Sequence, residues 1–452
     1  MKLPEEFIAN IRRLLTPEAA EGFFAAYDQP VLAGLRVNTL KISADELQRI
    51  APFKLTPVSW AAEGFYYDRQ ERPAKHPYYH AGLYYLQEPS AMAPAAVLAP
   101  RPGDRVLDLC AAPGGKTTQL AAAMQGEGLL VANDLGSDRV KVLVKNVELA
   151  GITNAIIVNE TPERLAPRFQ NFFDKVLVDV PCSGEGMFRK DAGVMAAWTG
   201  QSYLAFSRTQ LQLLQTASTM VRPGGKLLYS TCTFTPLENE EVILQFLRNN
   251  PDFHLLDIPK TAGFAPGITA QGECLSAVAR LWPHLQPAEG HFLALLERKE
   301  GADAPLPSKN QLPKVALETY RSFVSQYLQK VDFDRCFITY GEYLYSQPHG
   351  LPSLHGLKIV RPGLYLGQLK KQRFEPSHAL AMAVRADQAV QCMDFTGNDP
   401  DVIRYLKAET LPNTMEGKGW VLMCVAGYPL GWAKATPEGL KNYYTSAWRW
   451  VD

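Results

Sequence analysis

Two cysteines in this sequence stand directly after strand-like apolar runs. Cys182 follows a run that begins at Phe173 (FDKVLVDVP), and Cys232 follows one that begins at Leu227 (LLYST). Strands of an open α/β sheet would bring both thiols to the edge where such sheets bind ligands. A cysteine thiolate is a nucleophile that can form covalent intermediates, although either cysteine alone would by default be a small buried apolar residue. Which reaction the two thiols could carry out therefore depends on the ligand that binds at this edge of the sheet.

A third stretch, from Val106 to Met124 (VLDLCAAPGGKTTQLAAAM), has the features of a ligand cradle. It predicts a short strand, a tight turn through Gly114 and Gly115, and a helix that opens near Lys116. Glycines let backbone N–H groups approach a ligand without a Cβ in the way, and the helix N-terminus adds partial positive charge. A Gly-Gly turn alone is also common in ordinary strand-to-helix connections.

The spacing of the glycines shows which kinds of nucleotide ligand such a turn could bind. A phosphate-binding loop needs a glycine where this chain has Cys110, and a dinucleotide loop needs G-x-G-x-x-G, of which only Gly114 and Gly115 are present. The next predicted strand, Leu129 to Ala132, leads to Asp134, where an acid would hold a ribose hydroxyl pair. The pattern favours an adenosine ligand without phosphates, of which S-adenosylmethionine is the obvious one.

Three motifs read together resemble a known family. CAAPGGKT, DVPCSGEGMFRKD and YSTCTFTPLENEEV are similar to motifs of the Nop2/Sun family of RNA cytosine-C5 methyltransferases, and the resemblance covers most of residues 30–298. It implies a class I S-adenosylmethionine-dependent methyltransferase, with a Rossmann-like doubly wound α/β sheet and a reversed last strand. It also implies an N-terminal α+β RNA-binding segment and a PUA-like small β-barrel module at the C-terminus.

The resemblance assigns roles to the two thiols. C5 of cytosine needs activation, which a thiolate supplies by adding to C6; a base then removes the C5 proton. By resemblance Cys232 is the nucleophile and Cys182 assists product release, whereas in DNA cytosine-C5 methyltransferases the Pro-Cys cysteine attacks, which would give the opposite assignment. Asp179 is placed to accept from cytosine N4. Lys190 could steady the polarised ring, or be an ordinary solvated lysine.

The resemblance also implies a set of cofactor-binding residues. These are Cys110, Ala111, Ala112, Pro113, Gly114, Gly115 and Lys116 in the turn, with Asp134, Arg139, Glu160 and Asp179. Glu160 stands where the family usually has aspartate. His284 and His291 have no acid or cysteine at ligand spacing, so no metal is expected.

The elements that must position these residues alternate between strand and helix. The expected order after Asp134 is helix Ser137–Leu149, strands Ala155–Val158 and Lys175–Val178, helix Ser207–Val221, a turn at Arg222-Pro-Gly-Gly, strand Lys226–Ser230, helix Glu238–Arg248, and a closing reversed hairpin of Phe253–Ile258 with Phe292–Glu297. Such alternation predicts a mostly parallel, doubly wound sheet.

The chain divides into five predicted parts. They are an N-terminal RNA-binding segment (1–95), the methyltransferase domain (96–298), a linker (299–313), an intermediate α+β module (314–380) and a PUA-like RNA-binding module (381–452). The first part should contain a helix pair, with Thr16 as N-cap and Pro17 in the first turn, then a strand at Leu35–Lys41. The aromatic-rich stretch Tyr78–Met92 should pack between this segment and the main sheet.

The region after the linker carries candidate RNA contacts. Val315–Lys330 is expected to be helical and Cys336–Ser346 strand-like. Five basic residues and no acid lie in 358–373, and the tail mixes tryptophan and tyrosine with lysine and arginine. Aromatic faces with cations suit single-stranded or looped RNA, although a charge run is often only a solvated face. Cys336, Cys392 and Cys424 are expected to be small buried residues.

Composition limits the compartment and the partners. The 452 residues are 46% hydrophobic with 46 basic and 46 acidic side chains, and seven widely spaced cysteines form no C-x-x-C pair. We expect a cytoplasmic monomer without disulfides, metal or membrane segment, whose partner is RNA, namely 16S ribosomal RNA or the small subunit. Two alternatives stay open: a methyltransferase for an exocyclic nitrogen, and a non-catalytic ribosome-assembly factor.

Overall fold

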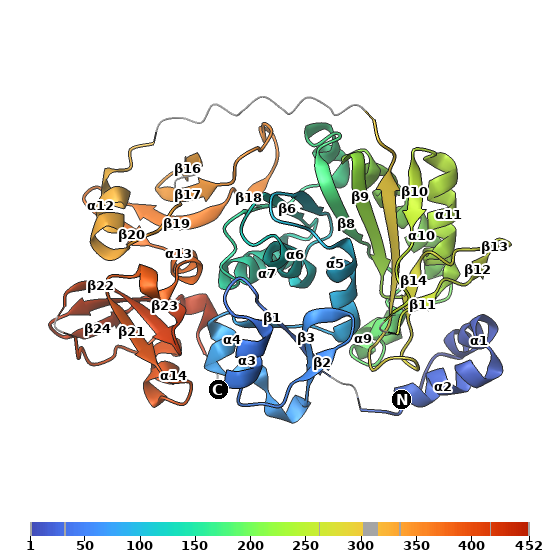
Figure 1. The fold of residues 1–452 in the computed structure, drawn as a ribbon, viewed down its shortest axis with the longest axis horizontal. Coiled ribbons are helices and arrows are strands. Elements are labelled where there is room, and N and C mark those ends of the chain that lie inside the picture. Colours follow the sequence, from blue (N-terminus) through green and yellow to red (C-terminus); the bar gives the residue numbers. More distant parts are fainter. Residues whose placement is uncertain are drawn as a thin grey trace.

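The centre of the molecule is a ten-stranded sheet whose middle strands are parallel (Figure 1). The computed structural model describes residues 2–30, 33–261, 263–301, 315–333, 336–415 and 417–450. The parallel strands run in the order β7, β6, β5, β8, β9. Their bounds are β5 Arg105–Asp108, β6 Leu129–Asn133, β7 Ala155–Val158, β8 Phe173–Asp179 and β9 Val221–Thr231. The chain order reverses between β5 and β8, so the carboxyl ends of these two strands flank a ligand crevice.

Antiparallel strands close one side of the sheet. Strand β15 (His291–Arg298) pairs with β9, and its other edge pairs with β10 (Phe253–Leu256) and β14 (Ala279–Leu281). Strand β11 (Ala265–Pro266) continues from β14, and β12 (Thr269–Ala270) forms a hairpin with β13 (Glu273–Cys274). The predicted Rossmann-like sheet with a reversed last strand is therefore confirmed.

Helices cover both faces of the sheet and form two apolar cores. They are α5 (Ala93–Leu98), α6 (Gly115–Ala123), α7 (Ser137–Leu149), α8 (Pro162–Leu165), α10 (Ser202–Ser218) and α11 (Glu240–Asn249), whereas α9 (Ala192–Ala197) packs beside the N-terminal helices. Helix α7 buries Val140, Leu143, Val144 and Val147, which lie on one helical face. Helix α10 starts five residues before its predicted start, because Tyr203 extends the buried face of Gln210, Leu214 and Ala217.

The predicted turn at Arg222-Pro-Gly-Gly is wrong. These residues lie within β9, in a bulge. Val221 pairs with Phe173 and Lys226 with Lys175, so the stretch between the two pairs is longer on β9 than on β8. Gly224 allows the bulge because its φ is +69°. Arg222 donates from Nε to Asp174 Oδ1 at 2.5 Å and so anchors the bulge to β8.

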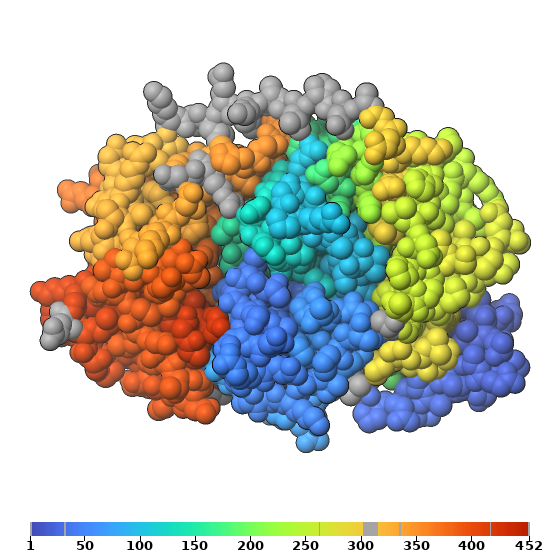
Figure 2. All heavy atoms as spheres, in the orientation of Figure 1, coloured from blue at the N-terminus to red at the C-terminus, as the bar shows by residue number. Residues whose placement is uncertain are grey.

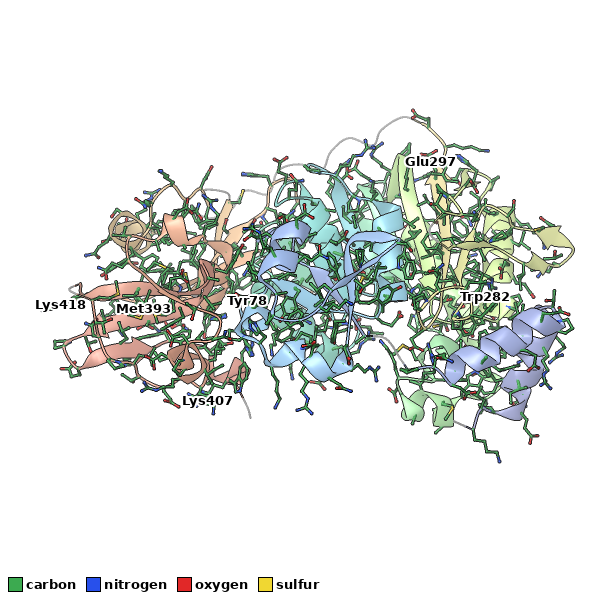
Figure 3. The ribbon with its side chains drawn as sticks, turned by 60° about the horizontal axis from the view of Figure 1, so that its bottom comes forward. Tyr78, Trp282, Glu297, Met393, Lys407 and Lys418 are labelled. Carbon is green, nitrogen blue, oxygen red and sulfur yellow. The ribbon has the colours of Figure 1, made fainter. Side chains whose placement is uncertain are left out.

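The N-terminal segment occupies two separate places. Helices α1 (Glu5–Leu14) and α2 (Pro17–Tyr27) form the predicted pair, and Thr16 accepts from the backbone N–H of Ala19. The pair packs on the catalytic domain beside Trp282 (Figure 3). An antiparallel sheet follows, with β1 (Ala33–Val37), β2 (Thr56–Val58), β3 (Ala61–Tyr67) and β4 (Tyr84–Leu86), and with helices α3 (Ala44–Ile50) and α4 (Pro77–His80). This sheet lies between the catalytic domain and the C-terminal part (Figure 1).

The C-terminal part contains two four-stranded sheets. The first holds β16 (Cys336–Tyr340), β17 (Tyr343–Gln347), β19 (Leu364–Leu369) and β20 (Phe374–Pro376), with α12 (Glu318–Tyr327) beside it. The second is formed by β21 (Cys392–Phe395), β22 (Gly419–Val425), β23 (Tyr428–Thr436) and β24 (Gly439–Asn442), with α14 (Pro400–Leu406). The proposed boundary between 380 and 381 falls inside α13 (His378–Ala383). Of the predicted linker, residues 302–313 lie outside the described residues.

Four of the five basic residues in 358–373 have a partner within the chain. Arg361 pairs with Glu148 and Lys358 donates to Asn159, while Lys370 and Arg373 pair with Glu342 and Glu375. Several tail aromatics are also packed: Trp432 is 1% exposed, and Tyr443 contacts Trp420. An RNA-binding role for this region stays a prediction, because these side chains already hold the fold together. No helix within the described ranges is long and apolar enough to cross a bilayer.

Candidate active site

The two thiols lie side by side beyond the ends of neighbouring parallel strands. Asp179, the last residue of β8, pairs in register with Ser230 of β9, so the chain segments that follow leave the sheet together. Cys182 Sγ and Cys232 Sγ are 3.4 Å apart, which is within hydrogen-bond distance for sulfur. The structure thus brings together two cysteines that are separated by 50 residues.

One of the two thiols is held protonated. The hydrogen bond with Cys232, and then burial, raise the pKa of the Cys182 thiol well above its ordinary value. Burial disfavours a thiolate because a charge loses its hydration there. Cys182 can therefore keep its proton and donate it in a hydrogen bond to the Cys232 sulfur.

Asp179 ends strand β8 shortly before Cys182 in the sequence, and its carboxyl is held ionised. Its Oδ2 receives the Lys116 ammonium at 2.6 Å and its Oδ1 accepts from the Ser230 hydroxyl at 2.7 Å. His291 Nε2 lies 3.7 Å from Oδ1, beyond hydrogen-bond distance. Burial raises the pKa of this carboxyl, but the Lys116 ammonium and His291 together outweigh burial and hold the pKa of Asp179 well below its usual range.

The turn after β5 is shaped by its glycines and held by neighbouring side chains. Gly114 has a φ of +113°, and a Cβ there would lie 3.2 Å from a methyl group of Leu143. Thr117 at the start of α6 donates to Asp108 at 2.7 Å. Arg36, from β1, donates to the Gly115 carbonyl at 3.0 Å and to Thr118 at 2.7 Å. The N-terminal sheet thus supports the predicted cofactor turn directly.

A cavity of about 200 Å³ opens beside this turn. Its lining comes from two segments and Asp179: Tyr85, Leu86, Gln87, Glu88, Ala91, Cys110, Ala111, Ala112, Pro113, Gly115, Lys116 and Asp179. Gly115 faces Tyr85 and Gln87 so closely that a Cβ would come within 3.1 Å of the tyrosine ring. Gln87 Oε1 is buried and has no hydrogen-bond partner among the described residues. A cavity that is lined by Gly115 and by the acidic side chains of Glu88 and Asp179 fits a ligand with an ammonium group, as S-adenosylmethionine has.

Four predicted cofactor residues do not line this cavity: Gly114, Asp134, Arg139 and Glu160. Asp134 accepts from the backbone N–H of Ala112 at 3.1 Å and of Gly136 at 2.9 Å, and Arg139 lies 3.4 Å from it. Asp134 and Arg139 therefore shape the turn from outside. Glu160 Oε1 accepts from the Lys358 backbone N–H at 2.6 Å, and its Oε2 pairs with Arg164 at 3.0 Å.

Lys190 is close enough to two acidic side chains for their charges to act on it. Burial lowers the pKa of Lys190, while Glu88 and Glu289 oppose that shift. Among the described residues, no three histidine, cysteine or acidic side chains gather as a metal-binding group. His284 packs edge-on against Phe23.

The sequence motifs missed the contribution of the N-terminal segment to the cavity. Tyr85, Gln87 and Glu88 belong to the aromatic-rich stretch that was expected only to pack, and Arg36 belongs to the predicted strand at 35–41. Glu88 accepts from the backbone N–H groups of Ala91 and Glu289. The proximity of these segments to Gly115 arises only in the folded chain.

The sheet order, the reversed last strand and the glycine turn after β5 define a class I S-adenosylmethionine-dependent methyltransferase. Sequence comparison narrows the class. The family described as 16S rRNA methyltransferase RsmB/F matches residues 95–297, and three RsmF domain families match the flanks: the N-terminal domain at 3–89, the first C-terminal domain at 322–384 and the PUA domain at 393–450. The chain belongs to the RsmB/F family and carries the domains of its RsmF branch.

Individual relatives agree with this assignment. The chain is 33% identical to ribosomal RNA small subunit methyltransferase F of Klebsiella pneumoniae (strain 342), over 98% of this chain and 95% of that protein. It is 32% identical to the protein of the same name from Shewanella baltica (strain OS155), over 98% and 96%. A methyltransferase homologue from Pyrococcus horikoshii has a similar structure, with a TM-score of 0.58 and 31% identity over 65% of this chain and 95% of that one. NSun6 from Pyrococcus horikoshii with SFG shares the fold, with a TM-score of 0.56 and 22% identity over 66% and 99%.

Proposed function

We propose that this protein forms 5-methylcytosine in 16S ribosomal RNA of the small subunit, through a covalent bond between Cys232 and C6 of the target cytosine. The observation that carries the proposal is the pair of thiols 3.4 Å apart beside Asp179, which also lines the cofactor cavity. Covalent activation of a pyrimidine needs a nucleophile and a second group that handles a proton, and a thiol pair offers both. The cysteines are free thiols, in keeping with a reaction in the cytoplasm.

The proposed reaction assigns one task to each thiol. The Cys232 thiolate forms a bond to C6, and the electron pair of the C5–C6 double bond makes C5 nucleophilic. When bound, S-adenosylmethionine supplies the methyl group that C5 takes. Water or another base then takes the C5 proton, and the electron pair of the broken C–H bond restores the double bond and expels the Cys232 thiolate; Cys182 assists this release. The high pKa of Cys182 keeps its proton at hand between these events.

Other residues orient the reactants in this proposal. Asp179 stays ionised, so its carboxylate can accept from the N4 amino group of a cytosine that has left its stack. The turn of residues 110–116, with Gln87 and Glu88 opposite, would hold S-adenosylmethionine, supported by Asp134 and Arg139. Lys190 would steady the negative charge that develops on the pyrimidine ring.

A trapping experiment with two single variants tests the proposal. Cys182→Ala and Cys232→Ala are incubated with S-adenosylmethionine and small-subunit RNA, naked or assembled, and run on a denaturing gel. We expect Cys182→Ala to retain a covalent protein–RNA band. Cys232→Ala should show no band and lose methyl transfer by at least about a thousandfold. Cys274→Ala, which changes an exposed cysteine, should behave like the unaltered protein.

The other outcomes discriminate between mechanisms. A band with Cys232→Ala alone would exchange the roles of the two cysteines. Methyl transfer to an exocyclic nitrogen, identified by mass spectrometry of the digested RNA, would overturn the C5 proposal. Failure of the unaltered protein to bind S-adenosylmethionine would favour a non-catalytic assembly factor.

A further inference from the structure

Two loops carry the thiols, and each loop contains a buried glutamate. We call residues 181–186 the Cys182 loop and residues 232–238 the Cys232 loop. Glu185 belongs to the first and is 1% exposed; Glu238 belongs to the second and is fully buried. Burying a carboxylate is costly unless it is well hydrogen-bonded, so two such groups beside the thiols require an explanation.

Glu185 binds the backbone of the opposite loop. Its Oε2 accepts from the backbone N–H of Phe234 at 2.7 Å and of Thr235 at 3.2 Å, and from the Thr233 hydroxyl at 2.7 Å. Its Oε1 accepts from the Tyr203 hydroxyl of α10. The carboxylate from the Cys182 loop therefore fixes the three residues that directly follow Cys232.

Glu238 makes the reverse connection. Its Oε2 accepts from the backbone N–H of Ser183, the residue next to Cys182, at 3.0 Å, and from Gln210 Nε2 at 2.7 Å. Two further links join the loops: the Gly186 N–H donates to the Cys232 carbonyl at 2.8 Å, and the Ser183 and Thr233 hydroxyls lie 2.7 Å apart. Each loop is thus held by a carboxylate that belongs to the other.

Strand pairing alone does not set the distance between the thiols. The last residues paired between β8 and β9 are Asp179 and Ser230, so both cysteines lie beyond the ladder. Backbone N–H groups past a strand end need new partners, and here the two glutamates supply them. We propose that Glu185 and Glu238 are positioning residues that hold Cys182 and Cys232 at reacting distance. The functional part of this inference rests on the proposed function, because it assumes that both thiols act on one substrate.

The spacing of the thiols can be measured without the methyl-transfer reaction. Phenylarsine oxide condenses with two neighbouring thiols, forming two As–S bonds and releasing water, and binds a single thiol far more weakly because the second bond is intramolecular. Cys392 and Cys424 form another close pair, with sulfur atoms 3.2 Å apart. The titration is therefore made in the full chain with Cys392→Ala, which leaves the active-site pair.

We expect Glu238→Ala in this background to bind phenylarsine oxide at least about tenfold more weakly. Glu238→Gln keeps an acceptor oxygen and should restore binding. Thr233→Val, a milder change that removes only the hydroxyl bonded to Ser183 and Glu185, should give a smaller loss and serves where Glu238→Ala does not fold. Glu148→Gln alters a partly buried carboxylate at the C-terminal interface and should leave arsenical binding unchanged. In the reaction, kcat should fall while KM for S-adenosylmethionine holds.

Two results would overturn the inference. One is arsenical binding by folded Glu238→Ala and Thr233→Val that equals the parent protein. The other is a loss of arsenical binding that is proportional to the fall in the thermal unfolding midpoint in every variant, Glu148→Gln included. In that case the two glutamates would only stabilise the fold. Because the arsenical reports spacing alone, the inference can hold even if trapping assigns the cysteines other roles.

Discussion

Lys116 and Asp179 link the cofactor cavity to the thiols through one ion pair. Both side chains line the cavity, and they are 14% and 27% exposed. Burial lowers the pKa of Lys116, but Asp179 outweighs that effect and the pKa is raised, while the pKa of Asp179 is held down in turn. The pair therefore stabilises the fold above the ordinary carboxyl pKa of 3.8 and up to the ordinary lysine pKa of 10.5. Its contribution is lost as pH falls through the lowered pKa of Asp179 or rises through the raised pKa of Lys116.

Lys116→Met should change how activity depends on pH. Without the ammonium, less opposes the effect of burial on Asp179, so the pKa of this carboxyl rises and it becomes protonated in milder acid. We expect the acid limb of kcat/KM to move toward neutral pH, with a loss of about tenfold or more in mild acid relative to alkaline solution. Profiles measured at saturating S-adenosylmethionine check this. Lys116→Arg, which keeps a cation, should retain the original acid limb; an unmoved limb in Lys116→Met would contradict the prediction.

The sequence motifs predicted which residues belong to the site, but not which residues they contact in the folded chain. The turn of residues 110–116 and both cysteines can be identified from the sequence because strand-like runs and glycines lie directly beside them. Glu185 and Glu238 lie inside the quoted motifs, yet nothing local shows that each binds the other's loop. Gln87 and Arg36 reach the site from a different sheet. Such roles depend on tertiary proximity, which spacing along the chain does not encode.

The strand β18 (Ile359–Arg361) joins the C-terminal part to the catalytic sheet. It pairs antiparallel with β7, and Arg361 pairs with Glu148 of α7 at 2.9 Å. The backbone N–H of Lys358 also donates to Glu160, so this predicted cofactor residue binds the C-terminal part instead. The methyltransferase sheet is therefore completed by a strand from beyond the predicted linker.

Two arginines of the same basic run should differ in their effect on stability. Arg361→Met leaves Glu148, whose pKa burial already raises, without its cation. We expect a loss of about 1–2 kcal/mol, less than for a fully buried pair, because the two side chains are 29% and 16% exposed. Arg373→Met breaks a pair whose arginine is 67% exposed, so it should cost about 0.5 kcal/mol or less. Urea unfolding and amide exchange of β7 measure both; equal losses would sink the argument.

Local pattern identified the regular elements but not the irregular ones. Helix α7 and strand β7 have the predicted bounds, because a buried helical face and a continuous apolar run specify them. The stretch at 222–225 reads as a turn from its proline and glycines, yet pairing on both sides makes it a bulge. Strand β18 has three residues and a partner some 200 positions away, so no periodicity reveals it.

At the scale of the whole molecule, the N-terminal sheet and the PUA sheet share one apolar core. Leu35, Val37 and Tyr84 belong to the same buried cluster as Tyr405 and Leu430. The space-filling view shows the two parts in direct contact across the lower centre of the molecule (Figure 2). The polar linker suggested a separate C-terminal module. The apolar residues of a sequence do not show which other part of the chain they will pack against. The C-terminal part is instead packed against both preceding parts.

Two half-buried histidines in this junction, His80 and His378, should make its stability depend on pH. His80 Nδ1 lies 3.1 Å from the Tyr444 hydroxyl, and His378 packs edge-on against Trp448, with ring centroids 4.7 Å apart. Neither ring nitrogen of His378 has a partner among the described residues. Burial lowers the pKa of His80 to about 4 and of His378 to about 3, so both are neutral in the fold.

The sign of the effect follows from where the protons bind. Below the ordinary histidine pKa of 6.5 the unfolded chain takes up protons that the folded chain cannot, so stability falls as pH drops toward the lowered values. One unit below that ordinary value, each histidine should cost about 1 kcal/mol. His378→Leu should remove its share of the slope, whereas His254→Gln, at an exposed position paired with Glu297, should keep it. Urea unfolding at neutral and mildly acidic pH, followed by amide exchange of residues 77–86, measures this. An undiminished slope in His378→Leu would show that other groups carry the pH dependence of the junction.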